Sequence, residues 1–264
     1  MRASRFRGII GSLSIVAATF VSSPVEAATL VLGASTQAWY SQGGFNLAVF
    51  GNQSSPIFNT FTGVQDSVEF RSYFVFDVGS ITSPIASGTL QLYQKRYYSS
   101  VSTETITLYD VTTPTTTLVS TQGTAAFDDL GSGEVYGSGT INADPPQNDL
   151  DNFVGEYFEV VLTQAAIDGI NQAVAESEDF AIGIMLSSID DTPYSFTTVQ
   201  RQTEGVLFSG GSTDPLQELE FPAQLILVEA DPEPPLAVTE PSAIVGFVSV
   251  LFLGALVKNG RSRR

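Results

Sequence analysis

Apolar and polar residues alternate through much of the middle of the chain, and this pattern predicts β-strands. The clearest run is Val68–Val78. Its apolar face carries Val68, Phe70, Phe74, Phe76 and Val78, and its other face carries Glu69, Arg71, Tyr73 and Asp77. A period of two residues over such a length is typical of a strand with one buried face.

Similar patterns predict further strands, separated by segments rich in Gly, Pro, Ser, Thr and Asp. These strands are Ala28–Leu32, Phe45–Phe50, Thr89–Tyr93, Thr105–Val111, Glu134–Ile141, Tyr157–Leu162, Phe180–Leu186, Gly205–Phe208 and Ala223–Val228. Residues 180–186 are continuously apolar, which predicts a central strand covered on both faces. The succession of strands and turns favours an all-β sandwich over alternating βαβ units.

A single helix is expected, from Thr163 as N-cap to about Ala175. Ile167, Ile170 and Val174 would share one face of it. We expect this short helix to cover one end of the sandwich.

The N-terminus has the pattern of a signal peptide. Arg2, Arg5 and Arg7 precede an apolar run, residues 8–21, and Val25 and Ala27 suit the −3 and −1 positions of a signal peptidase site. We therefore expect residues 1–27 to be removed on export. Residues 28–230 would form one β-sandwich domain, a common size for such folds, and residues 231–237 a Pro-rich linker.

The C-terminus, residues 238–264, combines three parts in order. The box Glu240–Pro241–Ser242 is followed by an apolar run, residues 243–257, and by a basic tail that includes Arg261, Arg263 and Arg264. As a helix the apolar run would span about 22 Å, less than the roughly 30 Å of a bilayer core, so it would hold the membrane weakly. The basic tail should stay cytoplasmic. A permanent single-pass anchor is the alternative.

This succession of box, apolar helix and basic tail resembles the PEP-CTERM sorting signal of bacteria that produce exopolysaccharide. The usual box is Val-Pro-Glu-Pro-Ser, and Thr239 replaces its first proline. The resemblance implies recognition by an exosortase and cleavage near Glu240–Ser242. It also implies a precursor held in the inner membrane and a mature protein at the cell surface or in the extracellular matrix.

Charge and composition exclude several function classes. The chain has 28 acidic and 11 basic residues, and the two end segments hold seven of the basic ones, so Arg71, Lys95, Arg96 and Arg201 are the cations of the body. Nucleic acid is therefore a poor partner. Neither Cys nor His is present. Catalysis by Ser-His-Asp or Cys-His groups and His-ligated zinc are excluded, whereas carboxylate chemistry and calcium stay open.

The segments Arg71–Val78 and Ile85–Tyr93 carry a second resemblance. They are similar to two strands of DNRLRE-type jelly rolls, which are like carbohydrate-binding modules, with Gly88 in place of the usual alanine. The resemblance implies a jelly-roll sandwich and contact with glycan, and it brings no catalytic residue. Arg71 beside Asp77 is interpreted as a structural ion pair or a solvated face.

Three groups of residues are candidates for a site. The first group consists of aromatic residues in expected loops with two neighbouring basic residues, a mixture that suits sugar rings. Its members are Trp39, Tyr40, Phe45, Tyr97 and Tyr98, together with Lys95 and Arg96. The alternative is that these aromatic rings pack against the rim of the sandwich. Asp144, Asp149 and Asp151 lie in a loop that could fold around calcium or remain a solvated acidic loop. Glu218 and Glu220, with Asp190 and Asp191, offer carboxylates for glycoside hydrolysis.

Together these patterns predict an exported protein that is not an enzyme and is associated with glycan. Its partners would be signal peptidase, an exosortase and exopolysaccharide, with a transient membrane stage and no required cofactor. A purely structural matrix protein is one alternative, and a carboxylate-based glycoside hydrolase is a more remote one.

Overall fold

Antiparallel strands make up most of the described chain in the computed structural model, which describes residues 27–50, 59–143, 153–189, 194–195, 202–210 and 221–231. The strands are β1 (Thr29–Gly33), β2 (Thr36–Ser41), β3 (Thr60–Gln65), β4 (Val68–Asp77), β5 (Ile85–Tyr98), β6 (Thr103–Asp110), β7 (Val135–Asn142), β8 (Phe153–Val161), β9 (Asp179–Leu186), β10 (Tyr194–Ser195), β11 (Gln202–Phe208) and β12 (Gln224–Glu229). The helices are α1 (Leu47–Phe50), α2 (Thr115–Ser120), α3 (Thr124–Asp129) and α4 (Gln164–Glu176). The expected all-β class is confirmed.

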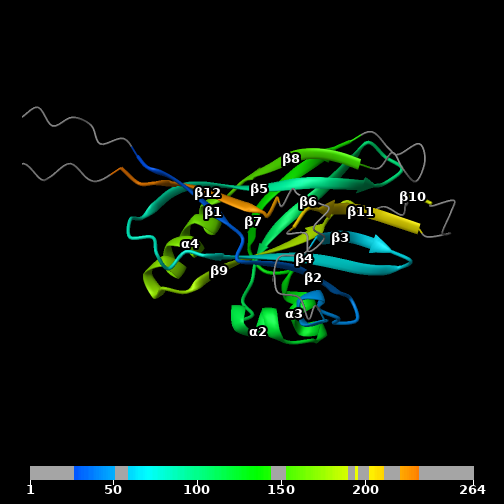
Figure 1. The fold of residues 1–264 in the computed structure, drawn as a ribbon, viewed down its shortest axis with the longest axis horizontal. Helices are drawn as coiled ribbons and strands as arrows, with labels where there is room; N and C mark the ends of the chain where they lie inside the picture. The colour runs from blue at the N-terminus through cyan, green and yellow to red at the C-terminus, as the bar shows by residue number, and fades with distance from the viewer. Residues whose placement is uncertain are drawn as a thin grey trace, which may run out of the picture.

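The strands form one sheet in the order β1-β12-β5-β11-β3-β4-β9-β6-β7, with β8 paired to β5, β2 to β4 and β10 to β11. This sheet folds over into two layers (Figure 1). β8, β5 and β12 lie in the upper layer of the view, and β9, β4 and β2 lie in the lower one.

The main core fills the space between the two layers. β4 contributes Phe74 and Phe76, β9 contributes Ile182 and Ile184, and β5 contributes Leu90 and Leu92; all six are buried. Burying a side chain of this size stabilises a fold by roughly 1.5–3 kcal/mol. The apolar face predicted for residues 68–78 therefore packs into the core along its second half.

β9 lies between β4 and β6 and is covered on both sides, as its apolar run predicts. Ile182 and Ile184 face the main core, while Ala181 belongs to a second cluster with Leu118, Phe127 and Leu130. Figure 1 shows α2 and α3 beneath this sheet. The second cluster also buries Tyr73 and Val75 of β4, so part of the strand face that carries Glu69, Arg71 and Asp77 is covered by short helices.

The predicted helix is present as α4, and Thr163 is its N-cap, accepting a hydrogen bond from the Ala166 N–H at 3.4 Å. α4 contacts β5, β7 and β9, which belong to both layers, so it covers one end of the sandwich as expected. The side chain of Asn171 anchors it, because it bonds both the N–H (2.7 Å) and the C=O (3.0 Å) of Ile85.

The strand predicted at Phe45–Phe50 was wrong, since residues 47–50 form α1. The reason lies in Asn46, whose Oδ1 accepts a hydrogen bond from the Ala48 N–H at 3.0 Å and so favours a helical turn over an extended chain. α2 and α3 were not predicted either. Both are only six residues long and carry no strong apolar period.

Asn46 is the centre of a buried polar network. Its Nδ2 donates to Tyr40 Oη at 3.0 Å, to the Leu118 C=O at 2.9 Å and to the Thr121 C=O at 3.0 Å. Its Oδ1 also accepts from Tyr73 Oη at 3.3 Å. These bonds join β2 and β4 to α2, and they satisfy polar groups that would otherwise be costly to bury.

Burial raises the pKa of Tyr73, and the nearby Tyr40 adds to this rise. Burial also raises the pKa of Tyr40, against the opposing effect of its hydrogen bonds to Thr121 and Asn46. The folded state therefore keeps these phenol protons more firmly than the unfolded chain, whose tyrosines titrate near pH 10. The network contributes its full stability below pH 10 and loses it as the pH rises above that value.

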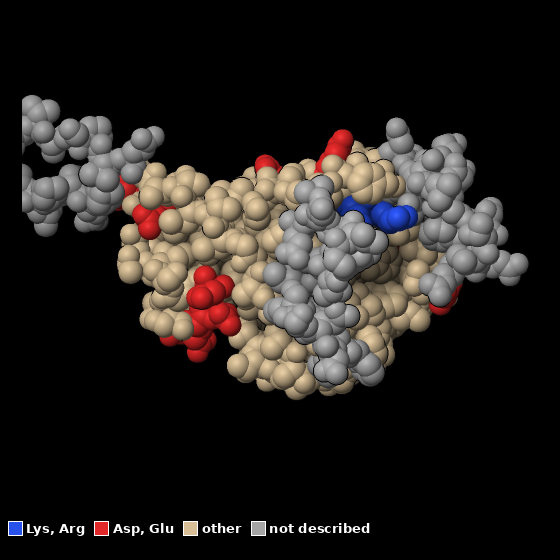
Figure 2. Space-filling model, viewed as in Figure 1, with Lys and Arg blue, Asp and Glu red and all other residues tan. Residues whose placement is uncertain are grey.

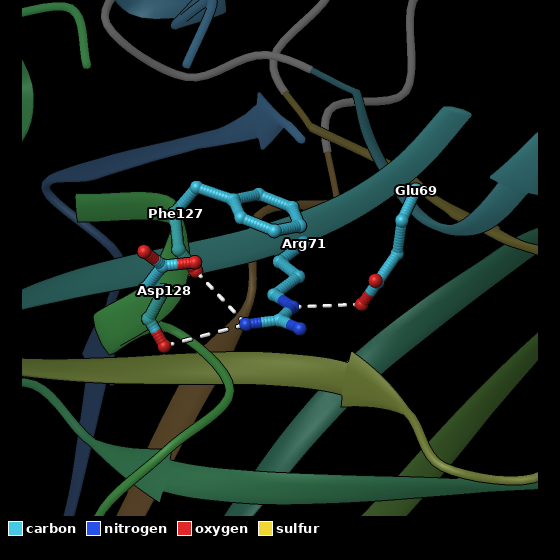
Figure 3. Close-up of polar contacts among 4 residues, drawn as sticks. All are labelled: Glu69, Arg71, Phe127 and Asp128. Carbon is cyan, nitrogen blue, oxygen red and sulfur yellow. Dashed lines mark hydrogen bonds and ion pairs between the residues drawn. The ribbon is translucent and has the colours of Figure 1, made fainter. Parts of the chain in front are cut away.

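Arg71 holds α3 against β4 (Figure 3). Its Nε pairs with Glu69 Oε1 at 2.7 Å, and its Nη1 donates to the C=O groups of Phe127 (3.1 Å) and Asp128 (3.3 Å). The guanidinium also lies 4.2 Å from the centre of the Phe127 ring. The structural role expected for Arg71 is thus confirmed, although its ion-pair partner is Glu69 and not Asp77.

The two ends of the described body lie together. β1 pairs with β12 in antiparallel register, and the Glu229 N–H donates to the Ala28 C=O at 2.9 Å. Figure 1 shows both ends at the same end of the molecule. In the described part of the chain, no helix has both the length and the apolar character needed to cross a membrane.

Candidate functional site

Of the aromatic residues predicted to lie in loops, Phe45 does so, whereas the other four lie on strands. Trp39 and Tyr40 belong to β2, and residues 95–98 form the end of β5. Tyr40 and Tyr97 are fully buried, and the Tyr97 hydroxyl donates to the Val101 C=O at 2.7 Å. Alternation along each strand explains this burial, because one of every two neighbouring rings must face inward. The prediction that Tyr40 and Tyr97 stack on sugar rings was therefore wrong, and both side chains pack inside the body instead.

Trp39 and Tyr98 are half-buried members of a row of rings. Trp39 contacts Phe45 and Phe70, with ring centres 5.6 and 5.1 Å apart, and Phe61 contacts Phe70 and Tyr98 at 5.6 and 6.1 Å. The row crosses β2, β4, β3 and β5. Each ring contacts at least one other ring and is partly buried, so the row mainly packs these four strands together.

A more open group of rings lies where β5 and β8 pair. We call Tyr93, Tyr157, Phe221 and Phe153 the aromatic platform. Tyr93 stacks on Phe221 with ring centres 4.2 Å apart, and Tyr157 meets both edge-on at 5.2 and 6.1 Å. Tyr157 is 45% exposed and Phe153 is 59% exposed. These are unusually open positions for large aromatic side chains.

The register of β5 and β8 builds this platform. Tyr93 lies directly opposite Tyr157, and Gln91 lies opposite Glu159, to which its Nε2 donates at 2.8 Å. Along β8, Tyr157, Glu159 and Val161 are exposed, whereas Val160 between the last two is buried in the main core. The alternation fixes the aromatic rings on the outer face of a flat pair of strands.

Positive charge lies next to the platform. Arg96 is the cross-strand partner of Phe153, and Lys95 precedes it. Partial burial lowers the pKa of Lys95, and the charge of Arg96 lowers it further. On the face shown in Figure 2, the blue of Lys and Arg is confined to one place, whereas red acidic groups are scattered over the described surface. Of the predicted glycan residues, Arg96 thus lies closest in register to the exposed rings.

The other predicted site residues lie outside the described residues. This holds for the sorting residues Glu240, Pro241, Ser242, Arg261, Arg263 and Arg264, for the calcium candidates Asp144, Asp149 and Asp151, and for the carboxylates Glu218, Glu220, Asp190 and Asp191. Within the described ranges, no group of three or more acidic side chains is arranged to hold a metal ion. Calcium binding stays a prediction.

A scan against models of protein families and a search of curated proteins both find no match to this chain.

None of the four platform residues, Tyr93, Tyr157, Phe153 and Phe221, is among the site residues predicted from the sequence. Tyr157 carries only a weak signal, since it shares a strand face with Glu159, but Glu156 on the other face is charged as well. The pairing of Tyr93 with Tyr157 carries none, since it depends on a register between segments 64 residues apart.

Proposed function

We propose that this chain is an exported, non-catalytic bacterial surface or matrix protein that associates with glycan through the aromatic platform. The body would be a jelly-roll sandwich, sorted by an exosortase through its PEP-CTERM-like tail. The observation that carries the proposal is the exposure of Tyr157 and Phe153 beside the stacked pair Tyr93 and Phe221.

Sugar rings present apolar C–H faces and hydroxyl edges, and the platform offers partners for both. Exposed aromatic rings supply the stacking surface, while Gln91, Glu159 and the Tyr93 and Tyr157 hydroxyls supply polar groups around it. The body has few cations, so an acidic polymer would be repelled by most of the surface. Neutral or weakly charged polysaccharide is the better ligand.

Retention on polysaccharide tests this proposal. The full-length protein should be retained on microcrystalline cellulose and pass through beads of acidic alginate. Each ring contributes roughly 0.5–1.5 kcal/mol, so Tyr157→Ala together with Phe153→Ala should weaken retention about 5- to 100-fold. Both side chains are exposed, and the unfolding temperature should therefore change little.

Val161→Ala is the matched control, because Val161 is 75% exposed on the same strand but has no ring. It should bind cellulose as the wild type does. Equal retention of the wild type and the double variant would refute the platform, and absence of retention on any neutral polymer would leave the structural matrix role. Release of reducing sugar would instead identify an enzyme.

The sorting part of the proposal has its own test, the intact mass of the exported protein. The first strand begins at Thr29, two residues after the expected signal peptidase site. In a host with an exosortase, the mature protein should begin at Ala28 and end between Glu240 and Ser242. A mature form that still carries Arg264 would contradict exosortase cleavage and favour a permanent anchor.

A further inference from the structure

A groove at the far side of the molecule from the platform has features of a second binding site. It lies between the α4–β9 junction and the segment 111–116, which follows β6 and includes the start of α2, and it has a volume of about 620 Å³. Pockets for small ligands range over about 300–1,000 Å³. The rings of Tyr136 and Phe180, stacked 5.7 Å apart, line it, and it shares no residue with the platform.

The charge of the groove is negative and uncompensated. Glu176, Glu178 and Asp179 line it and are exposed, whereas none of the basic residues in the described ranges does so. Glu176 ends α4, where the helix carries its own partial negative charge, and the last turn has no basic residue. Asp179 also lies directly opposite Asp77 on β4, a like-charge pair that destabilises the sheet. Figure 2 shows acidic side chains gathered at this end.

Tyr136 gives an independent sign of a ligand. Only 8% of it is exposed, and its hydroxyl has no hydrogen-bond partner among the described residues. The hydroxyl fits against Gly169 of α4, where a Cβ would lie only 2.5 Å away. The hydroxyl of a ring this deeply buried is usually hydrogen-bonded, so the Tyr136 hydroxyl is left available to a group in the groove.

The environment keeps the Tyr136 hydroxyl protonated. Burial raises its pKa to about 12, and the charges of Asp110 and Glu134 act in the same direction. At neutral pH the hydroxyl of this groove-lining tyrosine is a hydrogen-bond donor, and a ligand oxygen is its natural acceptor.

The wall opposite the carboxylates is lined with hydroxyl groups. Thr112, Thr113, Thr115 and Thr116 form it. Asp129 fixes this segment, since its Oδ1 accepts from Thr112 Oγ1 at 2.8 Å and its Oδ2 accepts from the Thr113 N–H at 2.7 Å. The groove is thus lined by carboxylates of the α4–β9 junction, by hydroxyls of the segment 112–116 and by the rings of Tyr136 and Phe180.

We propose that this groove binds a saccharide with free amino groups. The carboxylates of Glu176, Glu178 and Asp179 receive its ammonium groups, and the threonine hydroxyls and Tyr136 bind its hydroxyl and ring oxygens. A neutral sugar would leave the carboxylates uncompensated, and a simple amine would leave Tyr136 unpaired. The site is separate from the platform, so either can fail without the other.

Two oligosaccharides that differ only in N-acetylation, which removes the positive charge of each amino group, test the proposal by calorimetry. The full-length protein at pH 6 should bind the hexamer of glucosamine at least tenfold more tightly than the hexamer of N-acetylglucosamine. Binding should weaken as salt is raised, because the attraction is between exposed charges. The glucosamine hexamer should also raise the unfolding temperature.

Variants locate the site. Glu178→Gln with Asp179→Asn should weaken binding of the glucosamine hexamer at least tenfold. Tyr136→Phe removes only the hydroxyl and should weaken it about three- to tenfold without lowering the unfolding temperature. Glu156→Gln, which removes an exposed carboxylate from β8, should bind as the wild type does, and so should the platform variant Tyr157→Ala.

Four outcomes would overturn the proposal. They are equal binding of the two hexamers, no effect of the groove variants, an equal effect of Glu156→Gln, and binding of spermidine as tight as that of the glucosamine hexamer. Tight binding of spermidine would show that the groove binds cations in general and that its hydroxyl groups do not contribute to recognition.

Discussion

Replacing Phe74 by aspartate is expected to prevent folding. Phe74 is fully buried in the main core, between Gln37 of β2 and Ile182 of β9 in the register of the sheet. An unpaired charge there costs several kcal/mol, and the change also removes a large apolar side chain from a fold whose total stability is about 5–15 kcal/mol. The variant should give insoluble protein or a circular dichroism spectrum without β structure.

Phe74→Leu is the control for position. It keeps an apolar side chain of similar size, so it should fold and lose only about 1–2 kcal/mol of unfolding free energy. A folded Phe74→Asp protein with near-native stability would mean that β4 does not face the core at this position.

Asn46→Ala is expected to lower the free energy of unfolding by about 3–5 kcal/mol. The change removes every hydrogen bond that the Asn46 side chain makes to Tyr40, Tyr73, Leu118, Thr121 and Ala48. Several buried polar groups would then lack a partner, and each such group costs about 1–3 kcal/mol of stability. The loss is partly compensated, because the Tyr40 hydroxyl also donates to the Leu118 and Thr121 carbonyls. Urea denaturation measures the effect.

Asn142→Ala provides the comparison, because Asn142 is exposed at the end of β7 and its Nδ2 makes only a long bond, 3.4 Å, to the Thr140 C=O. Its effect should stay within about 0.5 kcal/mol. If both variants unfolded at the same urea concentration, the network around Asn46 would contribute no more to the free energy of unfolding than the exposed side chain of Asn142.

Local periodicity explains which parts of the fold could be predicted. β4 and α4 each repeat an apolar pattern of their own, and β9 is one continuous apolar run; these patterns are visible without knowledge of any partner. β2 shows no such pattern. Its core-facing Gln37 is polar, and its burial makes sense only through its bonds to the Ser209 C=O (2.9 Å) and the Ala223 N–H (3.0 Å), both more than 170 residues away.

The candidate surfaces were harder to predict for the same reason. The residue types around Trp39 and Tyr97 suggested sugar contact, but which ring of each aromatic pair faces solvent depends on strand direction and register. The platform and the groove both join segments distant in sequence, as Tyr93 with Tyr157 and Tyr136 with Phe180 show. Composition still predicted the acidity that dominates the groove.

The pairing of β1 with β12 has a mechanical consequence. β12 is the last strand before the C-terminal segment, and it is bonded on one side to β1 and on the other to β5, the strand that carries Tyr93. A pull between the C-terminal segment and a polymer held at the platform acts along β12, at right angles to its hydrogen bonds. Such a load strains both ladders in shear, so the bonds must fail together. A pull that separates the two chain ends would instead open the β1–β12 ladder one bond at a time. A load of the first kind, which the proposed function would impose, therefore meets more resistance than a load that separates the chain ends.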